Sequence, residues 1–164
     1  MTKTATITAE RVRDVLDYDH ESGSLRWKVR VARSVHIGDI AGTINKGYRR
    51  IAIDGVVHNA HRLVWLHVYG VHPKQEIDHI DGDKLNNRVA NLRDVGRAVN
   101  AQNLRRPLKH AAVGLLGVSP SGAKFTARVQ IDGRQVYLGT FDTPDCAHAA
   151  YVAAKRVAQP GCTI

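Results

Sequence analysis

The sequence predicts an α+β fold made of two small units joined by a basic linker. Asp-Gly pairs at 54–55 and 132–133 each separate two runs of alternating apolar and polar residues, which is typical of β-hairpins. Each hairpin is followed by a helical pattern. We therefore expect a first unit at residues 1–104, a linker at 105–116, a second unit at 117–158 with a three-stranded antiparallel sheet and one packed helix, and a tail at 159–164.

The first unit shows start and stop signals for its elements. Thr8 can cap a short helix, and Gly70 can end a second helix that begins near His61. The Asp54-Gly55 turn predicts strands near 48–53 and 56–60. Further expected elements are a strand over the alternating stretch 24–31, a short strand at 76–80, a strand near 91–95 and a helix starting after Gly96.

The second unit has equally clear signals. The stretch 124–131 alternates, and the turn at Asp132-Gly133 leads into a second strand, "RQVYLGTF". Thr143 can cap a helix with Pro144 at its first position. Alanines recur along one stripe of this helix, so it can lie close on a sheet.

The charge of the chain favours a polyanionic partner. The formal net charge is +9 with a pI near 9.9, and residues 105–164 carry eight Lys and Arg against three Asp and Glu. Each phosphate that a basic group neutralises releases counterions, which drives binding to nucleic acids. Plain solubility is the alternative explanation of such a charge.

Apolar runs and cysteines exclude several classes of protein. No run approaches the roughly 20 apolar residues that cross a bilayer, and the first ten residues lack the apolar stretch of a signal peptide. We therefore expect a cytoplasmic protein without a membrane partner. The two cysteines, Cys146 and Cys162, form no CxxC pair, which argues against a disulfide scaffold and a zinc ribbon.

The stretch "IDHIDGD" (77–83) places a histidine between acids. An ordinary hairpin with polar turn residues is one explanation. A metal site is the other: Asp78 and His79 point to opposite sides of a strand, so Asp78 can bind a cation while His79 acts as general base for water. A helix after the returning strand can bring Asn100 opposite Asp78 as a second oxygen ligand, and Asn91 can face His79 and fix its imidazole.

These residues resemble the HNH endonucleases of the ββα-metal fold, including phage-borne and homing enzymes. The resemblance runs from His58 to Asn103 and rests on "HRLVW", "IDHIDGD", "NNR", "NLR" and a following Asn. It implies Asp78 and Asn100 as metal ligands, His79 as catalytic base, Asn91 as the residue that orients it, and Mg²⁺ or Mn²⁺ as cofactor. Gly96 stands where relatives tend to have Ser or Thr.

Other ligand sets fit less well. The EF-hand calcium pattern is absent, and His61 and His67 lie six residues apart, which is not the spacing of two zinc ligands on one helix face. Arg88 is a candidate phosphate contact.

The stretch from Gly117 to about Arg156 resembles the AP2/ERF DNA-binding domain, most clearly in "YLGTF" and "AAY". The resemblance implies a sheet that lies in the major groove and a helix behind it. We expect base and phosphate contacts from the sheet and phosphate contacts from the linker. The candidates on the sheet are Lys124, Arg128, Gln130, Arg134 and Tyr137, and those in the linker are Arg105, Arg106 and Lys109.

Together these features predict a metal-dependent HNH endonuclease that nicks one strand of double-stranded DNA, acting as a monomer or weak homodimer. Two alternatives remain open from the sequence. One is a non-catalytic DNA-binding regulator that uses the AP2-like module, and the other is an RNA-binding accessory protein.

Overall fold

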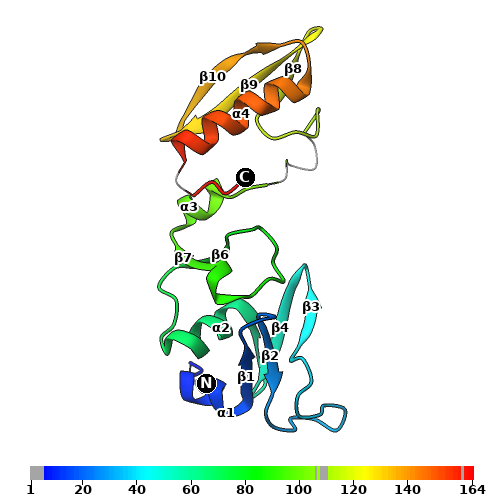
Figure 1. Cartoon of the computed structure of the whole chain (residues 1–164), viewed down its shortest axis with the longest axis vertical. Coiled ribbons are helices and arrows are strands. Elements are labelled where there is room, and N and C mark those ends of the chain that lie inside the picture. The colour runs from blue at the N-terminus through cyan, green and yellow to red at the C-terminus, as the bar shows by residue number, and fades with distance from the viewer. Residues whose placement is uncertain (1–5, 106, 108–110, 160) are drawn as a thin grey trace, which may run out of the picture. The chain divides into compact units, whose positions relative to one another are not determined.

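A computed structural model describes residues 6–105, 107, 111–159 and 161–164. The α+β prediction is confirmed (Figure 1). The chain divides into two compact units, Met1–Val95 and Gly96–Ile164. The third helix therefore belongs to the second unit, whereas the sequence suggested a division after residue 104.

The described residues of the first unit form two α-helices, one 3₁₀ helix and three small antiparallel sheets, with strand orders β1-β2, β3-β4-β5 and β6-β7 (Figure 1). In chain order its elements are α1 (Ala9–Val15), β1 (Leu16–Asp19), β2 (Ser24–Trp27), β3 (Thr43–Asn45), β4 (Tyr48–Ile53), β5 (Val56–Asn59), α2 (Ala60–Tyr69), β6 (Glu76–His79), η1 (Val89–Asn91) and β7 (Leu92–Val95).

Several local signals act as expected. The Thr8 side chain accepts a hydrogen bond from the Arg11 backbone N–H at 3.2 Å and so caps α1. Asp54 and Gly55, with φ of 51° and 79°, form a tight turn between β4 and β5. Gly70 ends α2 in the left-handed conformation.

Two strands differ from the prediction. The strand expected over 24–31 ends at Trp27, because its partner β1 is only four residues long. Beyond it, Val29 and Val31 are exposed. Strand β3 is not among the strands expected from the sequence, and it pairs with β4 across a tight turn whose residues Lys46 and Gly47 both have positive φ.

One hydrophobic core joins these sheets and helices. It includes residues of α1, β1, β2, β4, α2, β6 and β7, so the β6-β7 hairpin is anchored by Ile77 and Leu92 in the same core as the rest of the unit. The largest fully buried side chains of this core are Val12, Val15, Leu16, Leu25, Ile51, Leu63, Val64 and Leu66.

The second unit is a three-stranded antiparallel sheet with a helix across one face, preceded by a short helix (Figure 1). Ala127 of the central strand and Ala147 of the long helix are fully buried, which lets the helix lie close to the sheet. The sheet order is β10-β9-β8, and the elements are α3 (Arg97–Gln102), β8 (Val118–Ser121), β9 (Lys124–Ile131), β10 (Arg134–Phe141) and α4 (Pro144–Ala158).

The caps of α4 form as the sequence predicts. Thr143 accepts a hydrogen bond from the Cys146 backbone N–H at 3.2 Å, and Pro144 opens the helix. Among the described residues, every helix is too short or too polar to cross a membrane.

Gly117 tests the packing of α4 on the second unit. Its φ is +74°, and a Cβ there would lie 2.0 Å from the ring of Tyr151. We expect Gly117→Ala to lower the free energy of unfolding of this unit by about 3 kcal/mol, since backbone strain and overpacking add. Gly122→Ala, with φ of +60° and open space around it, should lose only about 1 kcal/mol. Chemical denaturation of both variants would measure this, and equal losses would contradict the contact.

Candidate functional site

The candidate site is built on the β6-β7 hairpin. The antiparallel register pairs Asp78 with Arg93 and His79 with Leu92. Asp94 fixes the entry to β6, because its carboxylate accepts the backbone N–H groups of residues 74 and 75 at 2.7 and 2.8 Å. Since successive side chains of a strand alternate in direction, Asp78 and His79 leave β6 on opposite faces, as the sequence suggested.

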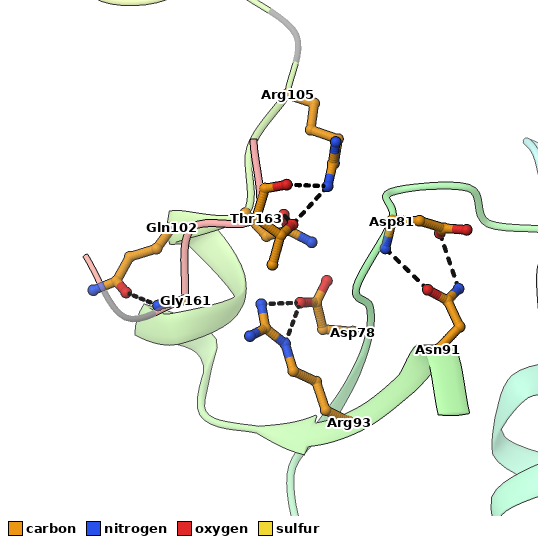
Figure 2. A network of polar contacts seen from close by, with 9 residues as sticks. Asp78, Asp81, Asn91, Arg93, Gln102, Arg105, Gly161 and Thr163 are labelled. Atoms are coloured by element: carbon orange, nitrogen blue, oxygen red, sulfur yellow. Dashed lines mark hydrogen bonds and ion pairs between the residues drawn. The ribbon is translucent and has the colours of Figure 1, made fainter. Parts of the chain in front are cut away.

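Asp78 forms a buried ion pair with its cross-strand neighbour (Figure 2). Its Oδ2 accepts from Nε of Arg93 at 2.8 Å and from Nη2 at 2.6 Å. The Asp78 side chain is only 7% exposed, so loss of the guanidinium would leave a buried charge without this compensation. Sequence reasoning missed Arg93, although pairing "NLR" with "IDH" in register would have placed it opposite Asp78.

Asn91 holds the loop that follows His79 (Figure 2). Its Oδ1 accepts from the Asp81 backbone N–H at 3.0 Å, and its Nδ2 donates to Asp81 Oδ1 at 2.9 Å and to the Asn86 carbonyl at 2.8 Å. Its own carbonyl accepts from the Ile80 backbone N–H at 2.9 Å. These contacts fix the two residues directly after His79.

The loop carboxylates take part in this arrangement. Burial acts to raise the pKa of Asp81, but hydrogen bonds from Asn86 and Asn91 outweigh it and bring the pKa below its usual value. Asp81 and Asp83 also accept backbone N–H groups two residues further on, at 2.8 and 2.9 Å, as Asx turns do. The carboxylates of Asp81 and Asp83 therefore hold the first part of the loop.

The imidazole of His79 is buried on the face directed toward α2 and β4. It is 5% exposed, and its Nε2 lies 3.0 Å from Oδ1 of Asn87. Its ring meets that of His61 edge-on at 5.2 Å between centroids, and Tyr48 lies at 6.3 Å. The sequence singled out neither Asn87 nor Tyr48 for the site, because the contacts depend on how the loop and β4 pack.

His61 is a second buried histidine beside the first. It opens the stretch "HRLVW" and is 7% exposed. Burial, assisted by His79 and Arg62, lowers the pKa of His61 to about 4. His61 is therefore neutral at physiological pH, and it packs against His79 without adding positive charge.

Asn100 lies in α3 of the second unit. Its backbone N–H donates to the Gly96 carbonyl at 3.0 Å, and Gly96 begins the helix without a side-chain cap. The C-terminal segment supports this helix (Figure 2): Gln102 Oε1 accepts from the Gly161 backbone N–H at 2.9 Å, and Arg105 donates to Thr163 Oγ1 at 2.6 Å. The expected tail thus packs on α3.

The oxygen atoms of Asp78 and Asn100 are of the kind that hard divalent cations prefer. In the described part of the chain, no group of three or more His, Cys, Asp and Glu side chains could hold a metal ion. A cation bound by the Asp78 carboxylate would share it with Arg93.

The expected DNA contacts lie in different settings. Arg88 donates from Nε to the Glu21 carbonyl at 2.5 Å, and Arg106 and Lys109 fall outside the described residues.

On the sheet of the second unit, Tyr137 pairs with Arg128 and Gln135 with Gln130. These four side chains share the face opposite the buried Ala127 and Val129. Lys124 forms an ion pair with Asp142 at 2.9 Å, and Arg134 lies at the exposed β9-β10 turn.

The buried state of His61 predicts a pH-dependent stability. Its pKa is about 4 in the folded protein and near 6.5 when exposed. The unfolded chain therefore binds the extra proton between these values, and the free energy of unfolding falls by about 3 kcal/mol as pH decreases from 6.5 to 4. Denaturation at several pH values should show a shallower dependence in His61→Gln. His36→Gln, at an exposed histidine, is the control and should keep the pH dependence of the wild type. A wild-type dependence of the free energy of unfolding on pH in His61→Gln would contradict this assignment.

A comparison with known protein families gives a match in the first part of the chain and α3. The model of a family described as HNH endonuclease matches residues 58–102, from β5 to the end of α3. No curated protein and no solved structure matches the chain. The match covers Asp78, His79, Asn91 and Asn100, and it supports an HNH domain, and hence nuclease activity, in this part of the chain.

Proposed function

We propose that this protein is a divalent-metal-dependent endonuclease that hydrolyses phosphodiester bonds in double-stranded DNA, with His79 as its general base. The observation that carries the proposal is the setting of His79 next to Asp78. The imidazole is buried and hydrogen-bonded through Nε2, and the loop that follows it is held by Asn91. This arrangement lies within the stretch that matches the HNH endonuclease family.

The hydrogen bond to Asn87 supports a particular tautomer of the base. An amide oxygen can only accept a hydrogen bond. In a neutral His79, Nε2 therefore carries the ring proton and donates a hydrogen bond to Oδ1 of Asn87. The lone pair is then on Nδ1, which is the nitrogen that would take a proton from the attacking water. Asn91 acts on the base indirectly, because it fixes the backbone directly after His79.

We assign Asp78 and Asn100 as the protein ligands of Mg²⁺ or Mn²⁺. When bound, the cation would neutralise charge on the phosphate oxygens of the scissile bond. Arg93 orients the Asp78 carboxylate through two hydrogen bonds to Oδ2. Burial of this carboxylate limits its motion and so favours a fixed geometry for ligation.

The second unit supplies the proposed duplex-binding surface, in the manner of an AP2/ERF domain. Arg128, Gln130 and Tyr137 share one sheet face, while α4 covers the other. A two-dimensional sheet surface with donors of this kind fits the edges of bases in a major groove. The linker residues Arg105, Arg106 and Lys109, together with Lys124, Arg134 and Arg88, are assigned to phosphates.

One active site per chain implies that each binding event nicks one strand. A monomer or weak homodimer satisfies this, and the setting would be intracellular, on phage or homing DNA. A non-catalytic DNA-binding regulator remains the second candidate, because the same exposed sheet face would serve it.

The decisive experiment incubates supercoiled plasmid with the protein and Mg²⁺ or Mn²⁺. We expect the wild type to nick the plasmid, EDTA to stop the reaction, and His79→Ala to lower the rate by about 10²–10⁴-fold, as loss of a general base does. His36→Ala, which removes an exposed histidine of the loop between β2 and β3, is the matched control and should nick like the wild type. Equal nicking by His79→Ala would refute the base assignment, and duplex binding without any nicking would favour the regulator.

Arg128 tests the duplex-binding surface. We expect Arg128→Ala to weaken binding to duplex DNA by about 10–100-fold, as loss of a base contact does, with little change in the slope of log affinity against log salt. Arg156→Ala removes the same charge from α4 and should leave the affinity unchanged. Fluorescence anisotropy at several salt concentrations measures the affinity and the slope of both variants. An unchanged affinity in Arg128→Ala would exclude this face as the binding surface.

A further inference from the structure

We propose that the N-terminal β1-β2 hairpin positions the general base, through Tyr18 of β1 and Asn87 of the loop between β6 and β7. The inference deepens the proposed function and rests on it for the catalytic role of His79. It makes Tyr18 and Asn87 positioning residues, and it gives the segment before the HNH match a part in the chemistry.

The contact nearest the base is a buried hydrogen bond. Oδ1 of Asn87 lies 3.0 Å from Nε2 of His79, and the two residues are 3% and 5% exposed. Water has little access to such a bond, so its geometry decides which ring nitrogen carries the proton. Asn87, however, lies in a loop and in no strand or helix, so its backbone needs another support.

The hydroxyl of Tyr18 supplies that support. It donates to the Asn87 carbonyl at 3.2 Å and accepts from the Val89 backbone N–H at 2.9 Å. Both hydrogen-bonding functions of one buried hydroxyl thus hold the loop backbone on either side of Arg88. A phenylalanine would fill the same core space, so burial alone does not require the hydroxyl.

The turn of the same hairpin makes a second contact with the loop. Nε of Arg88 donates to the Glu21 carbonyl at 2.5 Å. Gly23 has φ of +74°, and a Cβ there would lie 2.4 Å from the backbone nitrogen of Arg88 and 2.7 Å from the carbonyl carbon of Asn87. Position 23 requires glycine because of its positive φ and because a Cβ would collide with the loop backbone. The close approach of Gly23 fixes the backbone from which the Asn87 side chain reaches His79.

The test uses the full chain with ¹⁵N-labelled histidine. Long-range ¹H–¹⁵N spectra report which ring nitrogen of His79 is protonated, and the His79 signals are identified by their loss in His79→Ala. The wild type should show the Nε2–H tautomer. Tyr18→Phe and Asn87→Ala should shift the His79 signals away from it, whereas Asn87→Asp, which keeps an acceptor, should restore them at least in part.

The kinetics of nicking of supercoiled plasmid give the second readout. We expect Asn87→Ala to lower kcat by about 10–100-fold with KM for DNA unchanged, and Tyr18→Phe to lower kcat in the same way but less. Tyr69→Phe, which removes a hydroxyl from a half-exposed tyrosine of α2, is the matched control and should change neither readout.

The spectra decide the inference. His79 signals that stay at their wild-type positions in both Tyr18→Phe and Asn87→Ala would overturn it, even if nicking is normal. If the variants shift the His79 signals as expected but the wild type does not nick plasmid, the positioning role is supported and the endonuclease proposal is refuted. Should Tyr18→Phe fail to fold, the Asn87 pair of variants still gives the answer, since neither changes the hydrophobic core.

Discussion

The register between β6 and β7 is the constraint on which the site depends. It pairs Asp78 with Arg93, so the carboxylate meets a guanidinium on one face of the hairpin. His79 is directed to the other face, where α2 and β4 bury it. A slip of one residue would exchange the two faces and bury the carboxylate where the imidazole packs. Ile77 and Leu92, anchored in the core, hold the register against such a slip.

Hydrogen bonds of side-chain amides fix the loop of the hairpin, as backbone hydrogen bonds fix its strands. Asn91 engages Asp81 and Asn86, and Asn87 meets His79. A polar loop of this length would otherwise sample many conformations, and an imidazole beside it would lose its orientation. The network pairs donors and acceptors of the loop with one another, which favours a rigid site.

The two units differ in what their cores support. In the first, a single core anchors the hairpin with Asp78 and His79, and additional sheets support it. In the second, small residues allow α4 to cover one sheet face, so the opposite face is left to Arg128, Gln130 and Tyr137. The last residues of the chain pack on α3, the helix with Asn100. The residues that the sequence marked as a tail therefore have a structural role.

The sequence by itself determined the features that depend on neighbouring residues: the caps at Thr8 and Thr143, the tight turns at Asp54 and Asp132, and the alternation that separates Asp78 from His79. Only the tertiary structure decided the partners of the site. Arg93, Asn87, Tyr18 and Tyr48 come from different strands and loops, and their contacts depend on strand register and on how the core packs these elements together. Sequence patterns predict hydrogen bonds between residues that are a few positions apart. The contacts of Arg93 with Asp78 and of Tyr18 with Asn87 join residues that are 15 and 69 positions apart, and they form only when the whole unit folds.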